Sequence, residues 1–418
     1  MSRKKCAALV LAAGQGTRMK SEKPKVLHAI CGVSLVEHIV STLSAVKMNK
    51  IVVVVGYKQE LVRSSLKDSK ADFVIQKEQL GTAHAVKCAR GSLRDFSGDV
   101  LVIAGDVPLI QKSTLRSFVG FHRKNRSKAT VLTTTVNAPK AYGRIVRDGQ
   151  GHVIRIVEEL DASAEEKAIK EINSGIYLFD AKLLFKEVVR IKRNRKKREF
   201  YLTDIVEALI EKNITVNAYR IADADQVRGI NSRKDLGDLN RIMNKTTIRL
   251  LQESGVTILS EESTFIEQRV KIGRDTVIYP FTFIARDVTI GRNCKLGPFC
   301  KIRSKTRIKN DTTIGSFVEL NRSSIDNGVT IKHLAYIGDA WIGKNVNIGA
   351  GTITANFDGK KKHKTVIKDR ALIGANTVLV APVTVGRSAK TGAGSVVCAG
   401  RNIPDNKIAV GVPAKVIK

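Results

Sequence analysis

Continuous apolar runs alternate with segments of helical periodicity up to about residue 230. The apolar runs span residues 6–14, 51–57 and 100–106. Because polar residues do not interrupt them, they predict parallel strands that are buried on both faces of a sheet. Helices are expected between them, for example over Leu35 to Val46 and Ser113 to Lys124. This order predicts a doubly wound, Rossmann-like α/β domain.

Residues 231–255 show helical periodicity without an apolar run. Ser232 and Asp235 have the spacing of a capping box, and Gly255 suits the left-handed residue that ends many helices. We therefore expect a connecting helix over 231–255. It would separate one domain over residues 1–230 from a second over residues 256–418.

From about residue 256 an aliphatic residue recurs at every sixth position. Nine consecutive positions fit: Ile272, Ile278, Ile284, Ile290, Leu296, Ile302, Ile308, Ile314 and Leu320. After an irregular stretch the period resumes at Ile367, Ile373, Leu379 and Val385, and again at Val397. Three such hexapeptides make one triangular coil whose aliphatic side chains point inward. The repeat predicts a parallel β-helix.

Composition limits the class of partner. The 418 residues carry a formal net charge of +33, which favours anionic partners. Aromatic residues make up only 5% of the chain, so stacking surfaces for single strands are sparse and no specific nucleic-acid binding is expected. No segment approaches the ~20 apolar residues of a transmembrane helix, so no membrane span is expected.

The six cysteines and the N-terminus indicate the compartment. No two cysteines have C-x-x-C spacing, which argues against a zinc site or a disulfide framework and fits a reducing compartment. The basic and then apolar start superficially resembles a signal peptide. However, it leads into Gln15 to Arg18 without a spacer, so we interpret it as a buried strand and expect a cytoplasmic protein.

The stretch LAAGQGTRMKSEKPK, Leu11 to Lys25, combines a glycine-bearing turn with basic residues. A Walker A loop would continue from Gly14 as G-x-x-x-x-G-K-[ST], and a dinucleotide fingerprint would need a third glycine where Met19 stands. An ordinary strand-to-helix turn would explain the glycines but not the cations Arg18 and Lys25. Backbone N–H groups after a strand can cradle phosphates, so we interpret this loop as a phosphate site.

The same loop, L-A-A-G-x-G-T-R-M followed by P-K, resembles the signature of sugar-1-phosphate nucleotidyltransferases. Other matching segments include QLGTAHA (79–85), GDVPLI (105–110), EINSGIY (171–177), HLAYIGDA (333–340) and NVNIGAGTITANFDG (345–359). With the hexapeptide repeats, they make the chain similar to the bacterial bifunctional N-acetylglucosamine-1-phosphate uridylyltransferases/glucosamine-1-phosphate N-acetyltransferases. The resemblance implies a left-handed β-helix. It also implies synthesis of UDP-N-acetylglucosamine from glucosamine-1-phosphate, acetyl-CoA and UTP.

The resemblance also implies roles in uridylyl transfer. A sugar-1-phosphate oxygen would attack the α-phosphate of UTP and expel pyrophosphate, so fixed cations must offset the crowded negative charge. Arg18 and Lys25 are the implied catalytic cations, and Asp106 and Asn231 would bind Mg²⁺ through oxygen atoms. The implied nucleotide- and sugar-binding residues are Leu11, Ala12, Ala13, Gly14, Lys25, Gln76, Gly81, Thr82, Gly143, Glu158, Asn173 and Asn231.

For acetyl transfer, His333 matches the general base that accepts a proton from the attacking amine. Residues implied to contact the sugar phosphate are Arg303, Asn321, Tyr336 and Asn347. Residues implied to contact acetyl-CoA are Ala350, Asn356, Phe357, Lys362, Ala375 and Ala393. Lys362 lies in a loop that in relatives reaches a neighbouring subunit, so the resemblance implies a homotrimer.

Some positions of this second site depart from the family pattern. Asn321 stands where relatives have a lysine, and the loss of one charge-assisted contact costs about 1.5–3 kcal/mol. We expect no compensation from Arg322, because neighbouring residues of a strand face opposite sides. Ala375 replaces a serine near the CoA site, and the tail lacks an arginine found in many relatives. The identity of the acetyl acceptor therefore stays open.

Three alternatives remain at this point. The chain is a uridylyltransferase whose β-helix only trimerises or acetylates another sugar, or a regulatory subunit with the same two-domain layout, or a nucleic-acid-binding protein. The presence of Arg18, Lys25 and Asp106 argues against the regulatory subunit, and only the charge supports the last. We interpret the basic run RIKRNRKKR (190–198) as a solvated loop, with a nucleic-acid or phosphate contact as the alternative.

Overall fold

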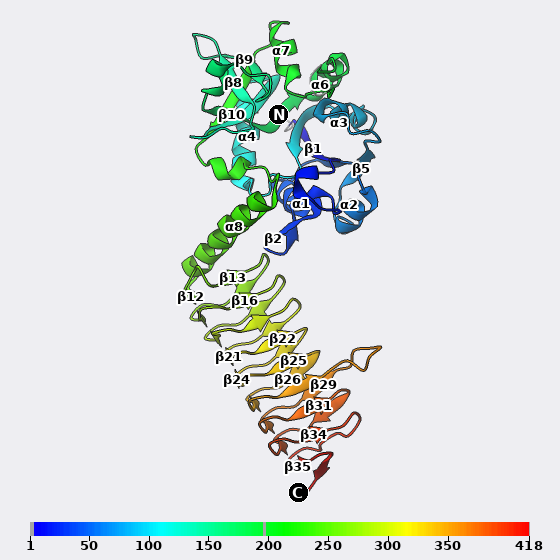
Figure 1. Ribbon diagram of the computed structural model, residues 1–418, viewed down its shortest axis with the longest axis vertical. Coiled ribbons are helices and arrows are strands. Elements are labelled where there is room, and N and C mark those ends of the chain that lie inside the picture. The colour runs from blue at the N-terminus through cyan, green and yellow to red at the C-terminus, as the bar shows by residue number, and fades with distance from the viewer. Residues whose placement is uncertain (1–3, 195–197, 418) are drawn as a thin grey trace. The chain divides into compact units, whose positions relative to one another are not determined.

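The computed structural model describes residues 4–194 and 198–417 and is shown in Figure 1. Two compact units divide between Leu239 and Asn240. This division falls inside α8 (Arg233–Glu253), the helix expected between the two domains. Arg195, Lys196 and Lys197 of the basic run lie outside the described residues.

A mixed β-sheet forms the centre of the first unit. Along its main path the strands are β11 (Val216–Ile221), β7 (Ala129–Thr135), β10 (Glu171–Asp180), β6 (Gly98–Ala104), β1 (Lys5–Ala12), β4 (Lys50–Val55) and β5 (Asp72–Ile75). β10 runs antiparallel to β6 and β7, whereas the other neighbours are parallel. The smaller strands are β8 (Arg144–Arg147) and β9 (Val153–Val157) beside β10, and the pair β2 (Ala29–Ile30) and β3 (Val33–Ser34). β1, β4 and β6 confirm the three strands predicted from the apolar runs.

Helices cover both faces of this sheet. They are α1 (Leu35–Val46), α2 (Gln59–Ser65), α3 (Thr82–Cys88), α4 (Lys112–Lys124), α5 (Ala164–Lys167), α6 (Ala181–Glu187) and α7 (Asp204–Ile210), with the short 3₁₀ turns η1 (Thr17–Met19), η2 (Lys25–Leu27), η3 (Gly91–Leu93), η4 (Val188–Arg190) and η5 (Ala224–Val227). Alternate residues of β1 enter two different cores. Leu9 packs in the cluster that contains residues of α3, α6 and α7, and Val10 packs in the one with α1 and α4. The doubly wound prediction is confirmed.

Both ends of α8 show the predicted caps. Ser232 Oγ accepts a hydrogen bond from the Asp235 N–H, and Asp235 Oδ2 accepts one from the Ser232 N–H. At the other end, Gly255 has a φ of +92°. The Val256 N–H donates to the Leu251 carbonyl, which is the Schellman pattern. The helix therefore begins and ends where its sequence predicts.

The second unit stacks short parallel strands into three sheets. The first sheet contains β12 (Thr257–Ile258), β15 (Val277–Ile278), β18 (Lys295–Leu296), β21 (Thr313–Ser316), β24 (Thr330–His333), β27 (Asn347–Ile348), β30 (Leu372–Ile373), β33 (Lys390–Thr391), β35 (Ile408–Gly411) and the antiparallel β36 (Ala414–Val416). The second contains β13 (Phe265–Ile266), β16 (Phe283–Ile284), β19 (Lys301–Ile302), β22 (Glu319–Asn321), β25 (Tyr336–Gly338), β28 (Ile353–Ala355), β31 (Val378–Val380) and β34 (Val396–Val397). The third contains β14 (Lys271–Ile272), β17 (Thr289–Ile290), β20 (Arg307–Ile308), β23 (Ser324–Ile325), β26 (Ala340–Ile342), β29 (Thr365–Ile367) and β32 (Val383–Val385).

This stacking is consistent with the expected left-handed β-helix, and the repeated aliphatic residues form one continuous core. We call the turn from the first to the second sheet the first corner, and the turn from the second to the third sheet the second corner. Phe281, Phe299 and Phe317 occupy the first corner of successive coils and stack their exposed rings, with centroids 4.7 and 5.4 Å apart.

The irregular stretch after Leu320 does not interrupt the coil. Ile325 and Ile342 each follow the preceding core residue by five positions instead of six, and both are fully buried. In the next coil, residues 356–364 form a longer loop between β28 and β29. All three changes fall at the second corner, where a turn can lose or gain residues without moving the inward position. The number of residues between core positions therefore changes, but the core residues still point inward.

Leu296 and Lys295 test the assignment of the core, because they are neighbours on β18 with opposite burial. Leu296→Ala should destabilise the β-helix by about 2–5 kcal/mol, since it leaves a cavity between coils. Lys295→Ala should change stability by no more than about 0.5 kcal/mol. Unfolding of the full chain, followed by circular dichroism, measures both. Equal effects would contradict the inward orientation of Leu296.

Candidate active sites

Two basic side chains of the N-terminal loop meet at one asparagine. Arg18 Nη2 donates a hydrogen bond to Asn231 Oδ1 over 2.9 Å, and Lys25 Nζ donates to the same oxygen over 3.3 Å. Lys25 Nζ also forms an ion pair with Asp106 Oδ2. The structure thus brings together all four residues that the sequence assigned to phosphate and metal chemistry.

The loop can hold Lys25 in this position because residue 16 is a glycine. Gly16 has a φ of +74°, and a Cβ atom there would lie 2.5 Å from the Cβ of Lys25. Lys25 begins η2, and Asp106 follows the end of β6, which pairs with β1. Both side chains therefore lie at the carboxyl edge of the parallel strands, where ligands of open α/β sheets bind.

The first turn of α8 fixes Asn231. Asp235 Oδ2 accepts hydrogen bonds from the backbone N–H groups of Asn231, over 3.0 Å, and Ser232, over 2.8 Å. Burial acts to raise the pKa of Asp235, but the hydrogen bonds from Ser232 and Asn231 outweigh it and hold that pKa below its ordinary value. An ionised Asp235 therefore orients Asn231 toward the two cations.

Residues 11–14 carry the chain from β1 into the loop. The Ala13 carbonyl accepts a hydrogen bond from the Tyr57 N–H over 3.1 Å, which ties the loop to the end of β4. A Cβ atom on Gly14 would meet no other atom within 4 Å. Open space therefore lies beside the segment expected to contact the nucleotide.

Gln76, Gly81 and Thr82, the residues expected to recognise the uracil, lie together at the start of α3. The buried Gln76 donates from Nε2 to the Gly81 carbonyl over 3.1 Å. Thr82 Oγ1 accepts a hydrogen bond from the Leu202 N–H over 3.0 Å. Gly81 has a φ of +108°, and a Cβ atom there would lie 2.5 Å from the Phe200 carbonyl oxygen, so this position requires glycine.

The three expected sugar contacts lie around β10. The Asn173 N–H donates to the Gly143 carbonyl over 2.9 Å, and Asn173 Nδ2 donates to Tyr177 Oη over 2.7 Å. Glu158 Oε1 accepts a hydrogen bond from Thr203 Oγ1 over 3.1 Å. Gly143 and Asn173 are thus in direct contact, whereas Glu158 is positioned separately from the start of α7.

The second corner of the β-helix gathers one part of the predicted acetyltransferase site. Arg303 lies in register with Asn321, and Tyr336 Oη accepts a hydrogen bond from Asn321 Nδ2 over 3.4 Å. Arg303 and Asn321 line a groove of about 460 Å³ together with Lys301, Lys305 and other residues. Asn356, Phe357 and Lys362 follow at the same corner, where Phe357 and Lys362 form a bridge across the loop.

Arg322 corrects one expectation from the sequence. Its φ of +49° takes it out of strand geometry, so the alternation of sides does not apply. Arg322 Nη1 donates to Asn321 Oδ1 over 3.0 Å and therefore faces the same groove, contrary to the prediction. Its Nε and Nη2 each donate to Asp339 over 2.6 Å, and this guanidinium lowers the pKa of Asp339. The arginine thus brings a cation beside Asn321, though one already paired with a carboxylate.

The first corner carries the rest of the predicted site. His333 ends β24 and is exposed, and Asn347 begins β27 in the same sheet. Ala350, Ala375 and Ala393 occupy equivalent places after β27, β30 and β33 and form a column along the corner. One chain therefore distributes the predicted acetyltransferase residues over two corners and does not gather them at one point.

Models of known protein families match separate parts of the chain. A family model described as nucleotidyl transferase matches residues 7–246. The model of bacterial transferase hexapeptide repeats matches residues 269–304 and 287–322, and the model of hexapeptide repeats of succinyl-transferase matches 364–399.

Whole-length relatives share one name. The bifunctional protein GlmU of Pelotomaculum thermopropionicum is 44% identical over 90% of this chain and 90% of its own length. Bifunctional GlmU proteins of Geobacillus sp. and Brevibacillus brevis are each 41% identical, over 96% and 97% of this chain and 94% and 95% of their own lengths. The chain belongs to the GlmU family. This family combines uridylyl and acetyl transfer, so the enzyme class and bifunctional nature predicted from the sequence are confirmed.

The structure adds three residues that the sequence motifs do not identify as part of a site. The capping-box spacing predicts only a helix cap for Asp235, but the same carboxylate also positions Asn231. Tyr142 Oη accepts a hydrogen bond from the Gly229 N–H and so supports the segment that leads to Asn231. Asp339 lies inside the matching segment HLAYIGDA, but no sequence motif indicates that it pairs with Arg322.

Among the helices described, none has the length and apolar character needed to cross a membrane.

Asp204, beside Glu158, makes stability depend on pH. Its burial, followed by repulsion from Glu158, raises the pKa of Asp204 from 3.8 to about 6. Because the folded-state pKa lies above the unfolded value, the protonated carboxyl group favours folding below about pH 4, and this contribution is lost as the pH rises through about 6. Asp204→Asn, which cannot ionise, should therefore stabilise the protein at pH 8. Because solvent screens this half-buried group, we expect about 1–2 kcal/mol, less ~0.5 kcal/mol for a lost helix-dipole interaction.

Thermal unfolding at pH 8 and pH 4 measures this difference. At pH 4 the variant should match the native chain or be slightly less stable, and the exposed substitution Glu211→Gln should give no pH-dependent gain. An Asp204→Asn protein that is equally destabilised at both pH values would contradict the assigned pKa.

Proposed function

We propose that the chain makes UDP-N-acetylglucosamine in two steps. Residues 256–418 transfer the acetyl group of acetyl-CoA to the amine of glucosamine-1-phosphate. Residues 1–230 then join the product to UTP, and residues 231–255 connect the two. The convergence of Arg18 and Lys25 on Asn231 Oδ1, with Asp106 on Lys25, is the observation that carries the proposal.

This arrangement suits attack by one phosphate on another. The sugar phosphate and the α-phosphate of UTP repel each other, so a fixed cation must lie within reach of both. Lys25 and Arg18 provide two cations that share a hydrogen-bond acceptor and therefore lie side by side. Their role is to neutralise the reactants and to stabilise the charge on the leaving pyrophosphate.

The same site suits Mg²⁺. Asp106 Oδ2 and Asn231 Oδ1 both face the Lys25 ammonium, so two oxygen ligands already point at one cation. Mg²⁺ commonly takes one or two protein oxygens and completes its shell with water and substrate phosphates. When bound, the ion would supply further neutralisation of the triphosphate. Asp106 and Asn231 would hold it, and Lys25 would turn toward the phosphates.

His333 is proposed as the base of acetyl transfer, and the site is proposed to form between subunits. Its residues occupy two corners of the prism, His333 and the alanine column at one and Arg303 with Asn356 at the other. Two prisms packed side by side can bring the first corner of one next to the second corner of the other. The hexapeptide repeats are associated with such assembly, and a homotrimer in the cytoplasm fits the proposal.

Lys25→Ala tests uridylyl transfer, with Lys23→Ala as a matched control on an exposed lysine of the same loop. Removal of a cation at the reacting phosphates should lower kcat by about 10²–10³-fold. The control should retain activity within about twofold, since Lys23 is exposed and lies outside the cluster. Pyrophosphate release from UTP and N-acetylglucosamine-1-phosphate is the measurement. Equal losses in both variants would contradict the proposed role of Lys25.

His333→Ala tests acetyl transfer through release of free thiol from acetyl-CoA with glucosamine-1-phosphate. The variant should lose about 10²-fold or more of this rate, because general-base catalysis contributes 10²–10⁴-fold. Its pyrophosphate release should be unchanged, and Lys25→Ala should show the reverse pattern. Absence of thiol release by the unsubstituted chain would favour a uridylyltransferase whose β-helix serves assembly or another sugar.

A further inference from the structure

A cavity of the first unit lies at the amino edge of the sheet, away from the Lys25 cluster. It measures about 600 Å³ and is formed by the start of β1, the turn after α1, and α4. The phosphate loop leaves β1 at its other end, and a strand of eight residues spans roughly 25 Å. This cavity is therefore separate from the cluster around Lys25.

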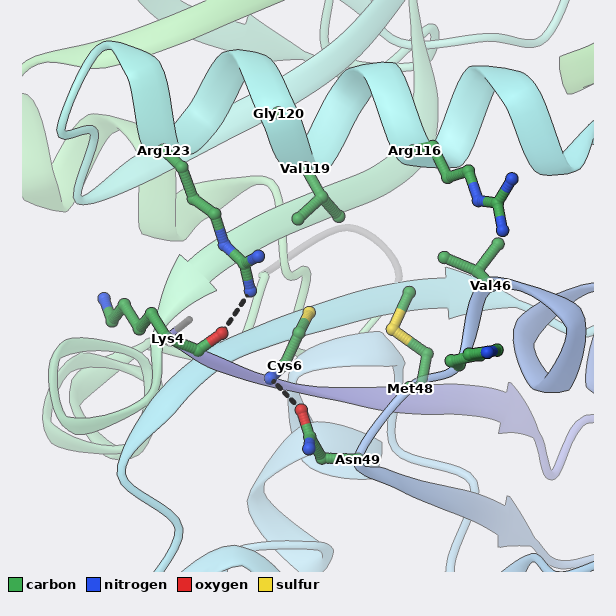
Figure 2. A pocket seen from close by; sticks show the side chains of 10 residues that line it. Lys4, Cys6, Val46, Met48, Asn49, Arg116, Val119, Gly120 and Arg123 are labelled. Atoms are coloured by element: carbon green, nitrogen blue, oxygen red, sulfur yellow. Dashed lines mark hydrogen bonds between the residues drawn. The ribbon is translucent and has the colours of Figure 1, made fainter. Parts of the chain in front are cut away.

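Four cations line the cavity: Lys4, Lys47, Arg116 and Arg123. No carboxylate is among its lining residues. Figure 2 shows Arg116 and Arg123 projecting from one face of α4 toward the strand and the turn below. Such a concentration of one charge favours a ligand with more than one negative charge.

Two of these cations are fixed and two are free to bind. Asp99, fully buried beneath the cavity, lies 2.6 Å from Lys4 Nζ, and Lys4 also reaches Asp180 at 3.4 Å. Arg123 donates a hydrogen bond to the Lys4 carbonyl and lies 3.7 Å from Asp99. For Lys47 and Arg116, the described part of the chain offers no ion-pair partner. The positive charge is thus only partly compensated.

The cavity also offers apolar surface. Val46 at the end of α1, Met48 from the turn and Val119 from α4 face one another across it (Figure 2). Small-ligand sites commonly combine such carbon surface with a few placed charges, in volumes of roughly 300–1,000 Å³. The ligand expected here carries an apolar or ring-shaped body as well as its negative charges.

Gly120 keeps this space open. It lies inside α4, where glycine is less favourable than alanine by about 1 kcal/mol. Packing does not require it, because a Cβ atom at this position would meet no atom within 4 Å. A larger side chain at residue 120 would instead project into the cavity that Gly120 lines. Glycine, although unfavourable in a helix, therefore occurs at the position where a side chain would fill the cavity.

We propose that this cavity is a second anion site that binds a small organic di- or triphosphate. Arg116 and Lys47 contact the phosphates, Lys4 and Arg123 supply fixed positive charge, and the Val46, Met48 and Val119 side chains contact the organic body. The site is independent of the transfer reactions, so it can exist whether or not the proposed function is correct.

The test measures ATP binding by calorimetry to the full chain carrying Arg18→Ala and Lys25→Ala, which weakens the first phosphate site. One saturable ATP site per chain is expected. Adding Gly120→Leu should weaken binding at least about tenfold by filling the cavity, and adding Arg116→Gln should do so by removing a charged contact. Gly120→Leu should fold with an unchanged or higher melting temperature, because leucine is the better helix former.

Two controls lie on the same helix outside the cavity. Ser117→Leu and Lys124→Gln alter exposed residues of α4 and should leave ATP affinity unchanged within about twofold. Absence of saturable binding, or equal losses in the controls, would overturn the proposal. Inorganic tripolyphosphate that binds as tightly as ATP would overturn the role given to the apolar surface.

Discussion

The ammonium group of Lys25, shared between Asp106 and Asn231, is the contact on which the first site depends. It joins three segments that are far apart in sequence: the loop after β1, the end of β6 and the start of α8. Each segment brings a different element to the carboxyl edge of the sheet. A reaction between two phosphates needs such a cation, because repulsion otherwise keeps the reactants apart. Gly16 leaves room for the Lys25 side chain, and Asp235 accepts a hydrogen bond from the Asn231 N–H, so both residues hold this arrangement.

The two units bury their apolar side chains in different ways. In the first, alternate residues of β1 enter separate cores, so helices must cover both faces of the sheet. In the second, the inward positions of the coils share one core, which Ile248 and Leu251 of α8 also join, and the stacked coils themselves bury the rest. In both units, most of the candidate site residues lie at positions that do not belong to the packed core. These are the carboxyl ends of strands in one unit and the corners of the prism in the other.

The second corner is the most variable part of the β-helix. It loses a residue in two coils and gains a loop in the next, while the buried isoleucines stay in register. The polar group formed by Asn321, Arg322 and Asp339 occupies this corner. Asn321 itself carries no charge, but Arg322 faces the same groove and is paired there with the Asp339 carboxylate.

The sequence by itself determined the fold class, the helix caps of α8 and the identity of most candidate residues. Periodicity indicates burial directly, and the loop motif contains Arg18 and Lys25, which meet at Asn231 in the structure. It did not determine the antiparallel direction of β10, the continuity of the coil after Leu320, or the orientation of Arg322. The direction of β10 depends on how the chain connects it to its neighbours. The left-handed conformation of Arg322 depends on a corner that exists only when the coils stack. The cavity beneath α4 likewise exists only in the folded chain, because three distant segments enclose it.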